Sequence, residues 1–395
     1  MLIDVGKGFL PYQRRLVAAG LMSRFRLARG VTNLTGAGLD LAEQVIDTMA
    51  TGAGRRWDLE LVAHPPVCRD PGTWQFAHDM SANFDCYQLA PDEYLWFDTN
   101  LAHLDWLRTR LETARPPLAV ASDDGVYRPV ADVRALVRDE FIAPSLGIHI
   151  ATAAESRDEM WRGVLDLVAE VARAVGVPGL LVERTPPAHY ARRAVGALLP
   201  SPQGGLEPWM LAYELGPAFD SYLGRPGIRV VEVGITSRVL AFAAHLQTGR
   251  AAVFGSTVVP TQVAVDLRSA GPDAERVLPP EVRGLRARIL PEPAANPHPS
   301  TIDGLAPVRY DPVTDRYRLL LEDYRVEHPR DRPLADVVAL ADRRLRSAQE
   351  DLLHRHLENL RTETAADPAR PVPGTVLSGA PGAPTGLLLD ARRLG

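Results

Sequence analysis

The connections between predicted strands are too short for a parallel sheet in the middle of the chain. Residues 131–141 (ADVRALVRDEF) and 147–154 (GIHIATAA) have the composition of two strands, and only the turn IAPSL separates them. A parallel crossover needs roughly a dozen residues or more, so this pair must run antiparallel. From about residue 16 to 265, helical patterns alternate with short apolar runs, and this order is typical of an α+β fold with helices packed on a mainly antiparallel sheet.

Apolar residues at helical spacing mark the helices of this region, and short apolar runs mark its strands. We predict helices at residues 39–50 (LDLAEQVIDTMA), 156–176 (SRDEMWRGVLDLVAEVARAVG), 208–223 (PWMLAYELGPAFDSYL) and 235–246 (ITSRVLAFAAHL), and further strands at 57–66 (WDLELVAHPP) and 228–234 (IRVVEVG).

The composition changes toward the C-terminus and suggests four parts. Residues 1–267 form the α+β domain, and residues 268–333 are proline-rich and are predicted to be a connecting segment or a small irregular module. Residues 334–363 carry an apolar stripe at helical spacing behind Pro333, which predicts a C-terminal helical appendage. Residues 364–395 are rich in Pro and Gly and are expected to be a flexible tail.

Charge and residue usage exclude several classes of function. The 44 basic and 49 acidic residues give a formal net charge of −5, which does not favour general attraction to nucleic acid. Lys7 is the only lysine, so no other position can supply a catalytic or phosphate-loop lysine. Cys68 and Cys86 are too few for a disulfide framework.

The sequence also lacks signals for export or membrane insertion. No apolar run reaches the length that crosses a bilayer, and residues 1–16 lack the positive-then-apolar pattern of a signal peptide. We therefore expect a cytoplasmic protein without a membrane partner.

An ATP site in this chain would have to be built from arginines. Neither GxxxxGK[ST] nor a GxGxxG between strand and helix occurs. Arg138 is predicted at the end of a strand, and Arg238 lies where a strand gives way to a helix after Gly234. A guanidinium can bind phosphate through two parallel hydrogen bonds and keeps its charge. Glu140, expected on the same strand face as Arg138, could accept a hydrogen bond from an adenine amino group.

The order of these segments resembles the catalytic domain of class II aminoacyl-tRNA synthetases, and it looks most like that of prolyl-tRNA synthetases. The resemblance covers about residues 16–265. It rests on three motifs: a long helix with a strand ending in proline (37–49 and 57–65), Arg-x-Glu (Arg138, Glu140), and Gly-x-x-x-Arg opening a helix (Gly234, Arg238).

The resemblance implies roles for the motif residues. Arg138 would hold the α-phosphate of a bent ATP, Glu140 its adenine edge and Arg238 its γ-phosphate, with Mg²⁺ bridging the phosphates. The implied reaction is attack of a carboxylate on the α-phosphorus, giving an acyl-adenylate and pyrophosphate. The helix-and-strand motif implies a homodimer.

The residues on the amino-acid side depart from the family pattern. Prolyl enzymes hold the substrate amine with a Thr-x-Glu loop, and the matching stretch here is Thr99-Asn100-Leu101, which lacks the carboxylate. Leu211-Ala212-Tyr213 replaces a Thr-Ser-His stretch, and an acidic position falls on Gly196. The loop after Glu140 is short, and no anticodon-binding domain is recognisable after residue 265. We expect Trp96, Thr99 and Tyr213 to line the acid pocket, with core packing as the alternative for Trp96.

Three functions fit this pattern, and the first fits it best. An adenylating ligase, plausibly of specialised metabolism, would keep the phosphate arginines, change the acid pocket, and pass the acyl group to an amine, a thiol or a carrier protein, with tRNA an unlikely partner. An inactive paralogue used for binding or regulation is the second hypothesis, and a true prolyl-tRNA synthetase is the third. A zinc site at His64, Cys68, His78 and Cys86 is disfavoured because no CxxC or HxxxH unit occurs, so no protein-bound metal is predicted.

Overall fold

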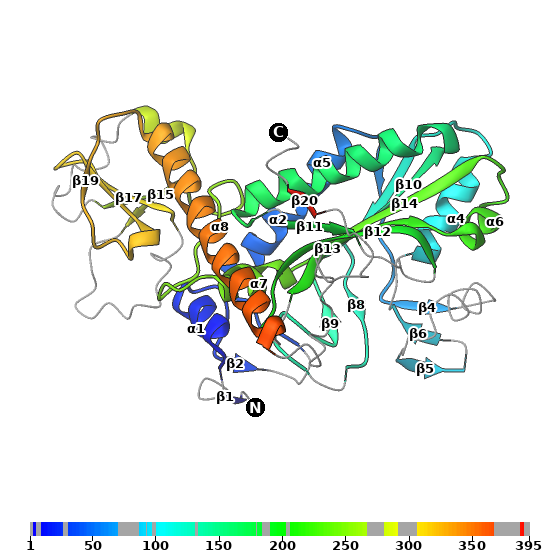
Figure 1. Cartoon of the computed structure of the whole chain (residues 1–395), viewed down its shortest axis with the longest axis horizontal. Coiled ribbons are helices and arrows are strands. Elements are labelled where there is room, and N and C mark those ends of the chain that lie inside the picture. The colour runs from blue at the N-terminus through cyan, green and yellow to red at the C-terminus, as the bar shows by residue number, and fades with distance from the viewer. Residues whose placement is uncertain are drawn as a thin grey trace.

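A long twisted sheet forms the centre of the molecule in the computed structural model, which describes residues 3–4, 9–26, 31–69, 87–91, 93–96, 100–130, 133–178, 180–183, 190–202, 206–266, 280–290, 306–366 and 388–390. The sheet has eight strands in the order β20-β11-β12-β13-β14-β10-β7-β3 (Figure 1). All neighbouring strands run antiparallel except the edge pair β3 and β7. The mainly antiparallel α+β architecture expected from the sequence is confirmed.

The elements of this sheet and its helices come from most of the chain. The strands are β3 (Leu59–Leu61), β7 (Leu118–Ser122), β10 (Ser145–Ala153), β11 (Leu180–Glu183), β12 (Ala191–Pro200), β13 (Leu206–Leu215), β14 (Ile228–Thr236) and β20 (Leu388–Asp390). The helices are α1 (Pro11–Ala18), α2 (Gly36–Gly54), α4 (Asn100–Arg110), α5 (Arg157–Val175), α6 (Pro217–Leu223), α7 (Arg238–Leu246) and α8 (Leu334–Ala366). Three smaller sheets of the same region lie outside it. The first consists of β4 (Val67–Arg69), β6 (Glu93–Leu95) and β5 (Gln88–Ala90), the second of β8 (Val126–Tyr127) and β9 (Phe141–Ile142), and the third of β1 (Ile3–Asp4) and β2 (Phe25–Arg26).

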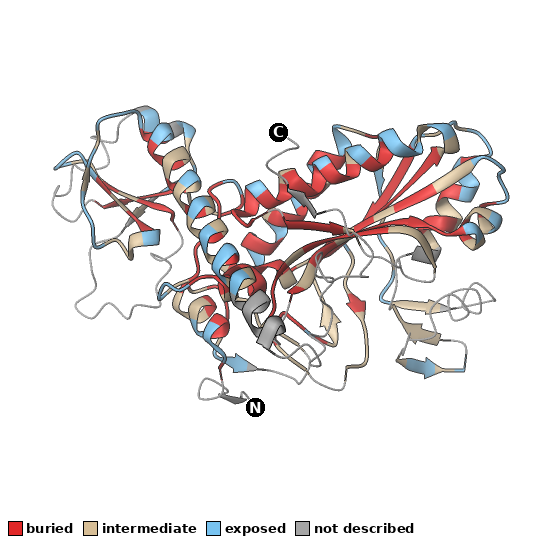
Figure 2. Cartoon of the chain, in the orientation of Figure 1, coloured by how far each residue is buried: buried red, intermediate tan, exposed pale blue. Residues whose placement is uncertain are grey.

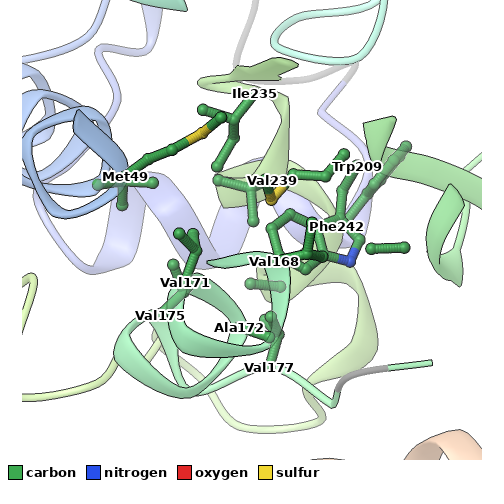
Figure 3. Close-up of a cluster of buried hydrophobic side chains, with 14 of the residues drawn as sticks. Met49, Val168, Val171, Ala172, Val175, Val177, Trp209, Ile235, Val239 and Phe242 are labelled. Atoms are coloured by element: carbon green, nitrogen blue, oxygen red, sulfur yellow. The ribbon is translucent and has the colours of Figure 1, made fainter. Parts of the chain in front are cut away.

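One face of the sheet is buried under α2, α5 and α7. Side chains alternate between the faces of a strand, and in β10 the residues Ile148 and Ile150 belong to this buried cluster. Figure 3 shows how Val168 and Val171 of α5, Met49 of α2 and Phe242 of α7 converge there. The buried residues are concentrated in the sheet and on the inner sides of these helices (Figure 2).

Glycine fixes the start of α2 against the preceding chain. The Thr35 side chain accepts a hydrogen bond from the Gly38 N–H and so caps the helix. A Cβ at Gly38 would lie 1.9 Å from the Leu21 carbonyl oxygen, so only glycine fits this close approach. At the other end of the core, α5 ends at Gly176, whose φ of +83° is the left-handed conformation common after a helix.

On the opposite face of the sheet, the described helices α4 and α6 cover one part. A second apolar cluster joins α4 and α6 to β7, β13 and β14, and includes Leu104, Val120, Tyr213 and Val230. Helices α4 and α6 lie at one end of the sheet, and α7 lies toward the other end (Figure 1).

The C-terminal region folds into a second sheet where a proline-rich connector was expected. Strands β16 (Ala287–Leu290), β15 (Val263–Asp266), β17 (Val308–Asp311), β18 (Arg316–Leu319) and β19 (His328–Pro329) form it in that order. Its apolar face packs against the first turns of α8, which confirms the predicted C-terminal helix. The strands span only two to four residues and prolines separate them, so their pattern is too short to identify in the sequence. Residues 367–387 and 391–395 of the expected tail lie outside the described residues.

Two elements of the main domain differ from the sequence prediction. Residues 133–140 form a tight turn and an isolated bridge between Arg134 and Arg138, not a strand, and Leu136 adopts a left-handed φ of 61°. Residues 206–215 form strand β13, and only Pro217–Leu223 is helical. In β13, pairing with β12 and β14 overrides the local helix propensity of the sequence WMLAYEL.

In the part of the chain that the structure describes, every helix is too short or too polar to cross a membrane.

Candidate functional site

Arg238 begins helix α7 immediately after strand β14. Strand pairing fixes this junction, because the Ser237 N–H donates to the Pro144 carbonyl beside β10. The Arg238 Nη2 donates to the Glu207 carboxylate at 2.8 Å, and its guanidinium lies 5.1 Å from the Phe242 ring centroid. The Nε–H of Arg238 is buried and has no hydrogen-bond partner among the described residues, so one donor of the fork remains for a ligand.

Arg138 is presented by the turn that replaces the expected strand. The Asp139 carboxylate accepts hydrogen bonds from the Leu136 N–H at 2.9 Å and from the Thr32 hydroxyl at 2.6 Å. The Tyr12 hydroxyl donates to the Ala135 carbonyl at 2.7 Å. These contacts hold the turn to the N-terminal helix region, while the Arg138 side chain is exposed. The turn therefore fixes the backbone and leaves the guanidinium accessible.

The two arginine charges act on one another. Burial lowers the pKa of the Arg238 guanidinium from its ordinary value, the Glu207 carboxylate opposes that effect, and the positive charge of Arg138 lowers the pKa further. Like charges repel one another, and an anion bound to both guanidinium groups would relieve the repulsion. The sequence predicted this pair from two positions a hundred residues apart, and a joint contact of both side chains with one ligand stays a prediction.

Bare backbone lies on the strand that leads to Arg238. Gly234 of β14 pairs directly with Gly147 of β10, so two neighbouring strands have no side chain on this part of the face. A Cβ at Gly234 would have only the Leu146 carbonyl oxygen within reach, at 3.6 Å, which is an ordinary contact. The glycine is therefore not required by packing at this point, and its lack of a side chain leaves space for a flat ligand on the sheet.

Glu140 lies close to Arg138 in the chain but not on a shared strand face. It is half-buried, and its backbone carbonyl accepts from the Arg128 N–H at 2.7 Å between β8 and β9. The predicted alternation along a strand from Arg138 to Glu140 is therefore wrong, because the chain turns at residues 134–139. The assignment of Glu140 to adenine remains a prediction.

A group of histidines lies toward the middle of the same sheet and was not predicted as a site. His149 of β10 shares the face of Gly147, and its Nδ1 lies 2.8 Å from the Nδ1 of His103 in α4. The Nε2 of His103 lies 3.1 Å from the Ser122 hydroxyl, and the Nε2 of His149 lies 4.0 Å from the Glu232 carboxylate. A polar chain therefore runs from β7 through α4 and β10 to β14.

These histidines are held neutral. Burial lowers the pKa of His149 to about 3 and that of His103 well below its ordinary value, with the neighbouring His149 and His64 acting in the same direction on His103. A neutral imidazole has one donor and one acceptor nitrogen, so the hydrogen bonds along this row of side chains can all point in one direction. Lone histidines in a strand and a helix carry no spacing signal, so only the fold reveals their contact.

The structure places two of the three residues that were predicted to line the acid pocket. Trp96 stacks on His64 with ring centroids 4.8 Å apart. The indole Nε1 of Trp96 and the Nε2 of His64 are buried, and neither has a hydrogen-bond partner within the described ranges. Tyr213 is buried in β13 and pairs in register with Glu232. Thr99 lies outside the described residues, so its place in the pocket stays a prediction. Trp96 thus adjoins the histidine group, and Tyr213 shares its sheet face.

The donor set suits a nucleotide better than a protein-bound metal. The buried, unpartnered Nε–H of Arg238 and the bare strands at Gly147 and Gly234 fit a polyphosphate with a flat ring beside it. Among the described residues, no group of three His, Cys, Asp or Glu side chains could hold a metal ion. His78 and Cys86 of the disfavoured zinc set lie outside those residues. Magnesium here would be held through phosphate oxygens and waters, as is usual for this ion.

Comparison with solved structures finds this fold in prolyl-tRNA synthetases. Giardia lamblia prolyl-tRNA synthetase in complex with prolyl-adenylate matches with a TM-score of 0.68 at 14% identity over 86% of this chain and 80% of that chain. Cryptosporidium parvum prolyl-tRNA synthetase complexed with L-proline and AMP matches with a TM-score of 0.68 at 12% identity over 89% and 78%. The same enzyme complexed with halofuginone and AMPPNP gives 0.67 at 12% identity over 89% and 78%.

The chain has the fold of the class II aminoacyl-tRNA synthetases, as the motif order predicted. No family model and no curated protein matches the sequence. The sequence motifs span residues 16–265, which are less than two-thirds of the chain. The structural alignment with the Giardia lamblia enzyme covers 86% of the chain and therefore includes part of the C-terminal region. The likeness is therefore longer than the sequence motifs indicated.

Proposed function

We propose that the chain is an ATP-dependent ligase that activates an amino acid or another small carboxylic acid as an acyl-adenylate and passes the acyl group to an acceptor other than tRNA. The observation that carries this proposal is the position of Arg238 at the start of α7, directly after the strand whose Gly234 pairs with Gly147, with the charge of Arg138 acting on its guanidinium. A triphosphate would compensate both charges, and its nucleoside would lie on uncovered backbone.

In the proposed reaction, a carboxylate oxygen of the acid attacks the α-phosphorus of ATP. A new P–O bond forms, the bond to the bridging oxygen of pyrophosphate breaks, and pyrophosphate leaves with the electron pair. Arg138 would hold the α-phosphate, Arg238 the γ-phosphate and Glu140 the adenine amino group. Mg²⁺, when bound, would offset charge on the phosphate oxygens. Positioning and charge compensation supply most of the rate in this chemistry, so no protein nucleophile is needed.

The acid would bind over the histidine group, with Trp96, Thr99 and Tyr213 as its proposed lining. Trp96 contributes an indole N–H that has no protein partner, and His64 contributes a buried ring nitrogen. The named complexes of the structural neighbours contain prolyl-adenylate, or L-proline and AMP, which supports a small-acid substrate for this fold. The loss of the acidic residue in Thr99-Asn100-Leu101 favours an acid other than proline.

The proposed acceptor is an amine, a thiol or a carrier protein, plausibly in specialised metabolism. In the second step the acceptor would attack the acyl carbon, the bond from that carbon to the phosphate oxygen would break, and AMP would leave. A second candidate is a synthetase that charges tRNA, because the structural likeness continues into the C-terminal region. A homodimer is proposed for either function, and Leu61 on edge strand β3, with 63% of its surface exposed, suits a covered interface.

ATP–pyrophosphate exchange, screened across amino acids and amine-free carboxylic acids, tests the proposal. We expect exchange that depends on one acid or one narrow class, and loss of that exchange in Arg238→Ala. ATP binding without exchange across the whole panel would favour a regulatory paralogue. Exchange with proline, together with charging of tRNA, would favour the synthetase.

A further inference from the structure

The C-terminal sheet has a topological switch point. The chain passes from β15 to β16 on one side of β15, and then to β17 on the other side of β15. All three strands run parallel. In open sheets of this kind, ligands bind outside the carboxyl ends of the two strands where the direction of winding reverses. Here those ends are Asp266 of β15 and Asp311 of β17. Figure 1 shows these strands beside α8, at the end of the molecule opposite α4 and α6.

A cavity of about 200 Å³ opens at this point. Its lining is wholly polar and comes from four strands or their ends: Asp266, Arg309, Asp311, Thr314, Arg316, Arg318 and Glu327. The other face of the same strands is apolar, because Tyr310 and Tyr317 pack in the core under α8. The sheet therefore buries one face against the helix and presents a charged, concave surface on the other.

The charges of the cavity are arranged in rows. Arg309 of β17 pairs in register with Arg318 of β18, so both side chains leave the same face of the sheet at the same level. Two residues further along β17, Asp311 lies at the level of Asp266, since the parallel register pairs Val265 with Tyr310. A step of two residues along a strand is about 6.6 Å. The level of Arg309 and Arg318 is therefore positive, and the next level holds Asp266, Asp311 and, in register with Asp311 on β18, Arg316.

Arg309 has a donor available in this cavity. Its Nε–H is buried and finds no hydrogen-bond partner in the part of the chain that the structure describes, and its guanidinium carbon lies 4.4 Å from the centroid of the Tyr324 ring. The other two arginines, Arg316 and Arg318, both bind the Glu327 carboxylate. An unpartnered buried donor costs free energy, and a ligand acceptor would recover it.

We propose that this cavity binds a free α-amino acid. The lining holds three arginines and three carboxylates, so an ion of either sign would leave a charge without compensation, whereas a zwitterion adds none. The carboxylate of the amino acid lies on Arg309, since Arg318 already binds Glu327. Its ammonium group donates to Asp266 and to Asp311, whose carboxylate also accepts from the Val313 and Thr314 N–H groups and the Thr314 hydroxyl. This site is separate from the histidine group and does not depend on the proposed ligase activity.

Calorimetric titration of the full chain with each common amino acid tests this site, with propionate, ethylamine and inorganic phosphate as matched probes. We expect at least one amino acid to bind with one-site stoichiometry, and Arg309→Gln to weaken that binding at least tenfold. Arg325→Gln is the control, because Arg325 is 75% exposed and lies outside the cavity. Arg309→Gln should leave ATP affinity and any acid-dependent ATP–pyrophosphate exchange unchanged. If the proposed ligase site over the histidines also binds an amino acid, that binding would persist in this variant, and the two sites can thus be told apart.

Thr314→Trp provides a second variant, since Thr314 is exposed at the rim and the larger side chain would fill the cavity without disturbing the core. Both variants should lose the same site. The proposal is overturned if no amino acid binds at a site that these substitutions remove, or if propionate or phosphate binds there as tightly as the amino acid. Failure of ATP–pyrophosphate exchange would leave this result unaffected.

Discussion

At the residue scale, the arrangement of Arg138 and Arg238 depends on neighbours that the motif itself does not contain. Asp139 and Tyr12 fix the turn under Arg138, and Glu207 holds one nitrogen of Arg238. The order of the motifs along the chain predicts which arginines would bind one ligand together, and that joint role stays a prediction. The motifs could not identify Glu207 or the turn, since both are set by contacts between distant segments.

The buried histidines predict an acid-sensitive fold. The folded-state pKa of His149 is about 3, below the value near 6.5 of an unfolded chain, so protons bind the unfolded state first as the pH falls. The contribution of His149 is therefore complete above pH 6.5 and is lost toward pH 3, at about 1.4 kcal/mol per pH unit.

Urea unfolding at several pH values between 7 and 4.5 measures this slope. His149→Gln should lower the slope of the unfolding free energy against pH by up to about 1.4 kcal/mol per pH unit, which corresponds to the uptake of one proton on unfolding. His354→Gln is the control, because His354 is 72% exposed on α8 and should leave the slope unchanged. Equal slopes in wild type and His149→Gln would mean that His149 titrates normally in the folded protein.

At the element scale, the strands and helices of the core follow their sequence patterns, and the exceptions have local causes. Helices α2, α5 and α7 and strand β14 form where periodicity predicts them. Strand β13 was predicted as a helix, because a strand buried on both faces has no clean alternation. The turn at residues 133–140 was predicted as a strand, because nothing in its composition indicates the left-handed Leu136.

Two glycines should respond differently to the same substitution. Gly38→Ala should destabilise the protein by several kcal/mol, as the new methyl group would overlap the Leu21 carbonyl. Gly234→Ala should leave the midpoint of thermal unfolding within a few degrees, because its Cβ meets only an ordinary contact at 3.6 Å. We expect Gly234→Ala nevertheless to weaken ATP binding several-fold. Normal ATP affinity in Gly234→Ala would remove the bare strand pair from the site.

At the scale of the whole molecule, the long helix α8 joins the C-terminal sheet to the main domain. Its first turns pack on the C-terminal sheet, and Leu353, further along, belongs to the main core. The Asp342 carboxylate accepts hydrogen bonds from both the N–H and the hydroxyl of Ser256, just before β15. The sequence predicted the helix but not the sheet it covers, because strands of two to four residues give too short a pattern.

Asp342→Ala should loosen this connection. It removes two hydrogen bonds to a charged acceptor, and we expect a loss of about 2 to 4 kcal/mol in the free energy of unfolding. Asp351→Ala, an exposed position on the same helix, is the matched control and should change little. Chemical denaturation followed by circular dichroism measures both, and equal stability of the two variants would contradict a structural role for the Ser256 contact.

The proposed homodimer can be tested through edge strand β3. Leu61→Glu places a charge on a surface that the dimer would bury, so we expect the variant to sediment as a monomer while the wild type sediments as a dimer. Leu89→Glu, at another exposed leucine away from β3, should leave the dimer intact. A monomeric wild-type chain at micromolar concentration would contradict the dimer.

The central claim is that Arg138 and Arg238 together bind a triphosphate. Calorimetric titration of ATP into the wild type, Arg138→Ala, Arg238→Ala and the double variant measures this directly, with the exposed Arg225→Ala as control. We predict that each single substitution weakens ATP binding at least tenfold and that the two losses are not additive, since one ligand contacts both side chains. Equal ATP affinity in the wild type and in Arg238→Ala would contradict the account.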